Sequence, residues 1–235
     1  MNKLSNGKTE LVFILDKSGS MARLADDARE GFNSLIEQNK AVATDNVFVT
    51  TVLFNNTYDV VTNRESIADV VPLTKSDYCT CGTTALFDAV GKTVAYLDGV
   101  HKEMNAEDVP SKTIVFITTD GYENASTLYS GKDVQKLISR KTQEGWKFVF
   151  LASGIDAEEQ ADALGVDKRF AVRCEHTNVG MRSMSRRMTC LSKAIVMQDE
   201  VADDNELLDM LHSEDVSDQD VDDIMCAFDN DQFTF

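Results

Sequence analysis

The segment LVFILDKSGSM, residues 11–21, runs five apolar residues directly into an aspartate, a lysine and a Ser-Gly-Ser sequence. Together with the residues before it, it forms a continuous apolar run over 9–15, which is typical of a strand buried on both faces of a sheet. Asp16, Ser18 and Ser20 follow that strand at alternate positions. In α/β folds ligands bind beyond the carboxyl ends of the strands, so these three side chains mark a candidate site.

The rest of the chain alternates between strand and helix patterns. Apolar, β-branched runs predict strands over 9–15, 47–54, 58–62, 112–119, 146–153 and 169–172. Apolar residues at helical spacing predict helices over 22–40, 84–104, 132–143, 156–165 and 179–197. The tight NNT turn before the 58–62 strand makes that strand antiparallel to its predecessor. We therefore expect an α/β fold, namely a doubly wound, Rossmann-like, mostly parallel six-stranded sheet with one antiparallel edge strand and helices on both faces.

The acidity of the chain is concentrated at its C-terminal end. The net charge is −17, but residues 196–235 hold 14 acids and no lysine or arginine, whereas residues 1–195 hold 26 acids and all 23 bases, for a net charge of −3. We therefore divide the chain into a folded domain, 1–197, and an acidic C-terminal tail, 198–235. A nucleic-acid partner is not expected, because binding phosphate groups requires clustered cations.

Apolar run lengths and cysteine usage indicate where the protein works. No apolar run approaches the roughly 20 residues needed to cross a bilayer, so no membrane partner is expected. The start, MNKLSNGKTE, lacks the apolar core of a secretory signal. Five cysteines are an odd number, which favours free thiols in a reducing compartment and a cytoplasmic location. No second cysteine pair accompanies Cys79 and Cys81, so we interpret them as small rim or buried residues.

Two further segments place oxygen-bearing side chains at the same edge of the predicted sheet. The segment CGTTAL, residues 81–86, supplies Thr83 and Thr84 at the start of a long helix, and Asp120 directly follows the 112–119 strand. If that strand lies beside the first strand, Asp16 and Asp120 converge, because parallel strands end at a common edge.

The donor types in this cluster select the metal. Only carboxylate and hydroxyl oxygens are present, with no histidine or cysteine at ligand spacing, which favours Mg²⁺ or Mn²⁺ over softer ions. Two carboxylates neutralise a divalent cation without excess negative charge. A further carboxylate from a partner is therefore not repelled.

The three segments together resemble the metal-ion-dependent adhesion site of the von Willebrand factor A domain. DKSGS, residues 16–20, resembles its D-x-S-x-S motif. TALFDA and TTDGYEN, residues 84–89 and 118–124, resemble its threonine and aspartate loops. The resemblance extends over residues 8–172 and is strongest to compact, stand-alone members found in bacteria and their phages.

The resemblance implies a ligand set and a function. Asp16, Ser18, Ser20 and Thr84 would contact Mg²⁺ or Mn²⁺ directly or nearly so, and Asp120 directly or through water. Thr84 is preferred to the adjacent threonine because TAL-DA fixes the register. The metal would then take an Asp or Glu carboxylate from a protein partner, which makes the chain a binding module and not an enzyme.

Other functions stay open at this stage. The acidic tail can regulate the metal site, join copies of the chain into a homo-oligomer, or dock on a separate protein. A metal-dependent phosphoryl-transfer or hydrolytic activity is a further alternative, although no general base, nucleophile or phosphate loop accompanies the aspartates. The 179–197 helix carries basic residues opposite its methionines, and these form either a solvated face or a surface for the acidic tail; they are Arg182, Arg186, Arg187 and Lys193.

Overall fold

The computed structural model describes residues 7–198 and 203–213, and its centre is a six-stranded sheet. The strands are β1 (Thr9–Asp16), β2 (Val47–Phe54), β3 (Tyr58–Ser66), β4 (Lys112–Thr119), β5 (Lys147–Ser153) and β6 (Ala171–Cys174). Their order across the sheet is β3-β2-β1-β4-β5-β6. Every neighbouring pair is parallel except β2 and β3, which are antiparallel. The predicted fold class is thereby confirmed.

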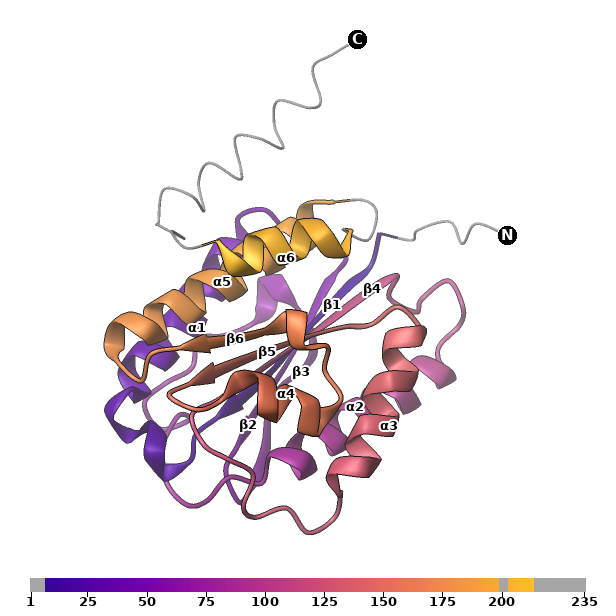
Figure 1. The fold of residues 1–235 in the computed structure, drawn as a ribbon. Coiled ribbons are helices and arrows are strands. Elements are labelled where there is room, and N and C mark those ends of the chain that lie inside the picture. The colour runs from indigo at the N-terminus through magenta and orange to yellow at the C-terminus, as the bar shows by residue number, and fades with distance from the viewer. Residues whose placement is uncertain (1–6, 199–202, 214–235) are drawn as a thin grey trace.

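Helices cover both faces of this sheet (Figure 1). They are α1 (Ala25–Lys40), α2 (Leu86–Glu103), α3 (Gly131–Gln143), α4 (Ala157–Leu164), α5 (Asn178–Met197) and α6 (Asp204–His212). On one face α1 packs against α5, and on the other α3 packs against both α2 and α4. Within the ranges that the structure describes, no helix is long and apolar enough to span a membrane.

The central strand β1 explains why the quoted segment decides the fold. All eight of its residues are buried. Phe13 stacks on Phe116 of β4 and meets Phe32 of α1 edge-on, with ring centroids 5.3 Å apart in both pairs. Leu15 lies opposite Thr118 in the parallel pairing of β1 and β4. The two strands therefore end side by side, at the edge where Asp16 emerges.

Several predicted boundaries shift by a few residues. A 3₁₀ turn, η1 (Gly19–Arg23), precedes α1, so the helix begins at Ala25 and not at residue 22. The antiparallel strand continues beyond the predicted 58–62 to Ser66, with register irregularities against β2. Arg64 adopts a positive φ of 50° there, which bends the edge strand.

The basic side chains of α5 are not a uniform solvated face. Arg182 pairs with Asp27 of α1 at 2.8 Å, and Arg187 donates to the carbonyl of Leu211 in α6. Lys193 is only 3% exposed, so for this residue the solvated interpretation is wrong. Helix α5 packs against α1, α6 and the four strands β1, β4, β5 and β6, and most of its C-terminal half is buried.

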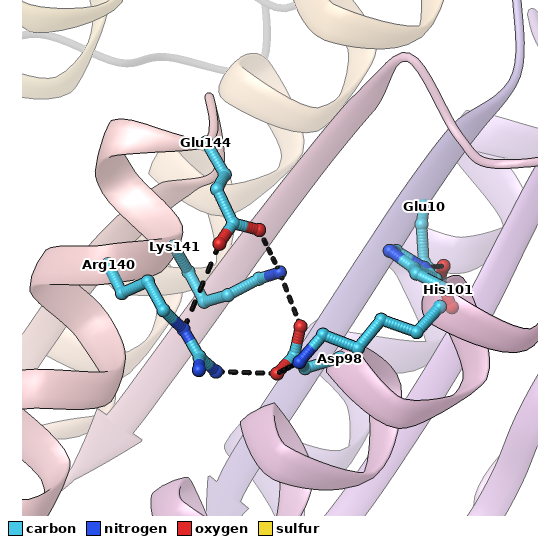
Figure 2. A network of polar contacts seen from close by, with 7 residues as sticks. Glu10, Asp98, His101, Arg140, Lys141 and Glu144 are labelled. Carbon is cyan, nitrogen blue, oxygen red and sulfur yellow. Dashed lines mark hydrogen bonds and ion pairs between the residues drawn. The ribbon is translucent and has the colours of Figure 1, made fainter. Parts of the chain in front are cut away.

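At the edge of the sheet opposite to Asp16, ion pairs link the C-terminal ends of α2 and α3 (Figure 2). Asp98 of α2 accepts from Lys141 at 2.8 Å and from Arg140 at 2.5 Å, and both donors lie on α3. Lys141 is nearly buried and also pairs with Glu144. In the same view, buried Glu10 of β1 pairs with His101. These ion pairs stabilise the ends of α2 and α3, and they lie at the edge of the sheet far from the candidate site.

Candidate metal centre

Asp16 is the last residue of β1 and is held at both carboxylate oxygens. Its Oδ1 accepts from the backbone N–H of Ser18 at 2.6 Å, and its Oδ2 accepts from the hydroxyl of Thr119 at 2.5 Å. Its backbone carbonyl accepts from the hydroxyl of buried Tyr78. The carboxylate is 0% exposed and therefore has one fixed orientation.

The two serines connect Asp16 to the second carboxylate. The Ser18 and Ser20 hydroxyl oxygens are 3.1 Å apart, and the Ser20 hydroxyl donates to Asp120 Oδ1 at 2.6 Å. Asp120 directly follows β4, the sheet neighbour of β1. Strand order thus brings together residues that are about a hundred positions apart in sequence.

The third segment places Thr84 beside this cluster. A Cβ built on Gly121 would lie 3.0 Å from Thr84 Oγ1 and 3.8 Å from Ser20 Oγ, so both hydroxyls border the same glycine. Thr84 is 3% exposed, whereas Thr83 is exposed. The Thr84 backbone donates to the side chain of Asn124 at 2.9 Å, which ties the threonine loop to the aspartate loop.

Backbone hydrogen bonds join the threonine loop to the serine loop. Gly19 donates its N–H to the carbonyl of Gly82 at 3.1 Å, and Cys81 donates to the carbonyl of Lys17 at 3.0 Å. Gly82 has a φ of +74°, and a Cβ there would lie 1.9 Å from Asn56 Oδ1. The positive φ favours glycine at this position, and a larger residue would also displace the Asn56 side chain.

Burial raises the pKa of both carboxyl groups. Desolvation raises the pKa of Asp16 to about 6, against the opposing hydrogen bonds from Thr119 and Ser18 and with a further increase from nearby Asp120. Desolvation likewise raises the pKa of Asp120, although the Ser20 hydroxyl and His176 oppose the shift. The two buried carboxyl groups thus lie among neutral hydroxyls, and His176 is the basic side chain that faces Asp120.

One oxygen of the cluster has no hydrogen bond. Asp120 Oδ2 is buried and accepts no hydrogen bond within the described part of the chain, and the imidazole Nδ1 of His176 lies 3.7 Å from it. A buried, unpaired carboxylate oxygen is costly unless a cation compensates it. The five side chains offer only carboxylate and hydroxyl oxygens as ligands. The residues therefore fit a hard divalent cation.

The structure brings all five predicted residues to one place, and it adds supporting residues that the sequence interpretation missed. Thr119 and Asn124 lie inside the quoted aspartate loop, so their positions were visible although their roles were not. Glu123 caps the start of α2 by accepting from the backbone of Phe87 at 2.8 Å. His176 follows β6 and lies beside Asp120, and no motif in the sequence indicated that position.

Comparison with known proteins decides the family. The model of the von Willebrand factor type A domain matches residues 10–189. The chain belongs to this family. No curated protein matches it.

Solved structures share the von Willebrand factor A fold at low sequence identity. Proximal thread matrix protein 1 from the mussel byssus, with a zinc-occupied MIDAS motif, is 16% identical with a TM-score of 0.57 over 79% of this chain and 48% of its own. The von Willebrand factor type A protein of Catenulispora acidiphila is 17% identical, with a TM-score of 0.53, over 79% and 42%. Manganese-loaded Plasmodium vivax TRAP protein is 15% identical, with a TM-score of 0.51, over 75% and 72%. The chain thus spans about half the length of the first two.

Proposed function

We propose that this von Willebrand factor A domain is a metal-dependent module that binds a protein partner. Asp16, Ser18, Ser20, Thr84 and Asp120 hold Mg²⁺, or Mn²⁺ in its place. When bound, the ion supplies an open coordination position that accepts an Asp or Glu carboxylate from the partner.

The unpaired Asp120 Oδ2 is the observation that carries this proposal. It lies in a cluster with a second buried carboxylate, Asp16, and both have a raised pKa. A divalent cation would neutralise both charges. No hydrogen bond from the described residues reaches Asp120 Oδ2 in its place. Ser18, Ser20 and Thr84 add oxygens without charge, so the filled site does not repel an acidic partner.

Two relatives support a divalent ion at this place without identifying it. The mussel protein was solved with zinc in its MIDAS motif, and the TRAP protein was solved in a manganese-loaded form. We favour Mg²⁺ or Mn²⁺ here because the donors in this chain are oxygens only.

The remaining parts of the proposal concern the whole chain. We propose that residues 1–197 bind the partner, that the acidic residues 198–235 regulate binding or assembly, and that neither nucleic acid nor membrane is a partner. We also propose a non-enzymatic role in the cytoplasm. The free thiols of Cys79, Cys81, Cys174 and Cys190 support a reducing compartment. Hydrolysis of phosphoester substrates that disappears in Asp16→Ala would instead support the enzyme alternative.

The test compares metal binding and partner capture in matched variants. Isothermal titration with MgCl₂ should give one site in the wild type and none in Asp16→Ala. Asp26→Ala is the control, because the Asp26 side chain is exposed at the start of α1 and pairs with Arg29 and Lys75, away from the cluster. Proteins captured from native cells by the wild type and the control, but lost with chelator and in Asp16→Ala, are the expected partners. Equal capture with and without chelator would contradict the proposal.

A further inference from the structure

The helix α6 docks on the domain outside the region matched by the family model. That region ends at residue 189, and α6 spans Asp204–His212. Leu207 and Leu211 are 1% and 0% exposed. Leu208 and Met210 are partly buried against the core, and the remaining positions of the helix include acidic side chains such as exposed Asp209. It is therefore a short acidic amphipathic helix whose leucines, four residues apart, share its buried face.

The surface beneath α6 complements the charge of the helix. The helix lies against α5 and the short turn η3 (Lys168–Phe170) (Figure 1). Lys147 of β5 pairs with Asp204 at the start of α6, and Arg187 of α5 donates to the carbonyl of Leu211 at its end. A hollow that Leu207 borders is also lined by Lys112, Thr113, Ile114, Gly145, Lys147 and Ile195. We name this surface, with Lys147 and Arg187 at its ends, the α6 groove.

The docked state of α6 depends on the groove and on the covalent connection. Nine residues are fewer than the roughly 12–15 that an isolated helix needs in water, so α6 is not expected to be helical away from the groove. Only two of its side chains, Leu207 and Leu211, are fully buried. The conformational entropy lost when the nine residues become ordered offsets much of the free energy gained by burying them. Only a few residues separate Met197, where α5 ends, from Asp204. This short connection keeps the helix at a high effective concentration near the groove.

We propose that the α6 groove is a docking site for an acidic amphipathic helix with leucines four residues apart, and that residues 203–213 of a second copy occupy it when two chains exchange this helix. The second copy has the identical segment, so every apolar and ionic contact can be remade between chains. Exchange of an identical element after a short connection is a low-cost route to a dimer. The inference is independent of the metal site, which lies at the opposite edge of the sheet.

The first experiment tests the groove with a peptide. A full-length Leu207→Asp/Leu211→Asp variant frees the groove, and a fluorescein-labelled peptide of residues 203–213 serves as the probe in fluorescence anisotropy. We expect saturable binding to this variant, and at least about tenfold weaker binding to the wild type because its own helix competes. A peptide with the same two leucines replaced by aspartate is the control and should not bind. Absence of saturation at millimolar variant, or equal affinity for wild type and variant, would overturn the docking site.

The second experiment tests exchange between copies. Lys147→Glu places a like charge opposite Asp204 and weakens the groove while leaving the helix intact. The Lys147 side chain is 24% exposed, so the substitution removes a half-buried ion pair and replaces it with a repulsive contact. Size-exclusion chromatography with light scattering at high concentration should show dimers for the wild type and monomers for the double leucine variant. A mixture of Lys147→Glu and the double leucine variant should give a heterodimer in which one helix is transferred. Circular dichroism of each protein confirms that it is folded. Folded wild type that stays monomeric at high concentration would overturn exchange.

Discussion

At the residue scale, the buried, ionised carboxylates of the candidate site destabilise the folded state. A bound cation would remove that destabilisation. Asp16 is fully buried and its pKa is raised to about 6, against 3.8 for an ordinary aspartate. A raised pKa means that the folded state binds the proton more tightly than the unfolded state. Without a cation, the ionised group therefore destabilises the fold above pH 6, and this penalty disappears as the pH falls below 3.8.

Replacing Asp16 by asparagine should separate stability from metal binding. The shift from 3.8 to about 6 corresponds to about 3 kcal/mol at pH 7 and about half of that at pH 5. In chelator, Asp16→Asn should thus raise the free energy of unfolding by about 1–3 kcal/mol at pH 7, and by less at pH 5. Urea unfolding at both pH values measures this. A variant less stable than the wild type in chelator at pH 7 would show that the buried charge is already compensated within the protein.

The two adjacent threonines provide a matched pair. Thr84 is buried beside Ser20 and Gly121, whereas Thr83 is exposed. Thr84→Ala should weaken Mg²⁺ binding at least about tenfold in isothermal titration, while Thr83→Ala should leave it unchanged. The reverse result would mean that the wrong threonine has been assigned to the site.

At the element scale, a buried ion pair joins α2 to α3. Burial alone would raise the pKa of Asp98, but hydrogen bonds and charges from Lys102, Lys141 and Arg140 outweigh it and lower the pKa to about 2 (Figure 2). A lowered pKa means that these contacts stabilise the fold at pH values above 3.8. That contribution is lost as the pH falls through about 2.

Asp98→Asn should therefore cost about 2 kcal/mol of unfolding free energy at pH 7 and little at pH 2. Asp162→Asn is the control, because its ion pair with Lys168 is long, at 3.7 Å, and exposed, and should contribute less than about 0.5 kcal/mol. Chemical denaturation of both variants gives the comparison. Metal affinity should not change in either variant, since the pair lies at the far edge of the sheet. Equal losses in the two variants would contradict a specific role for the α2–α3 pair.

The elements differ in how far the sequence predicts them. The six strands and five of the helices follow from local apolar periodicity. The requirement that Asp16 and Asp120 converge places β1 beside β4, but it does not determine the rest of the strand order. Helix α6 was visible only as a short apolar pattern in an acidic segment, because its position depends on tertiary contacts with Lys147 and Arg187. Of the acidic tail predicted over residues 198–235, the structure describes only 198 and 203–213.

At the site, residues within a motif were predictable and residues reaching it from elsewhere were not. Asp16, Ser18 and Ser20 come from one loop, and Thr84 and Asp120 each open or follow a predicted element. His176 arrives after β6, more than fifty positions beyond Asp120, and only the folded chain places its Nδ1 3.7 Å from that carboxylate. The buried position of Lys193 also escaped prediction, because it depends on the tertiary packing of α5 against the sheet and its neighbouring helices.

At the scale of the whole molecule, the cation should act as a stabilising ligand. Binding to the folded state alone adds about 2.7 kcal/mol when free Mg²⁺ is a hundredfold above its dissociation constant. For a chain of this size, that corresponds to a rise in melting temperature of about 5–10 °C. Differential scanning calorimetry with MgCl₂ and with chelator should show this rise in the wild type and not in Asp16→Ala. An identical rise in both proteins would place the ion elsewhere.

The most direct test of the central claim is the anomalous difference map of a crystal grown with MnCl₂. Three loops from distant parts of the chain should surround one manganese ion, with oxygens of Asp16, Ser18 and Ser20 at about 2.1–2.3 Å. Thr84 and Asp120 should contact the ion directly or through water. A map with no peak at this edge of the sheet, or with a peak held by other residues, would contradict it.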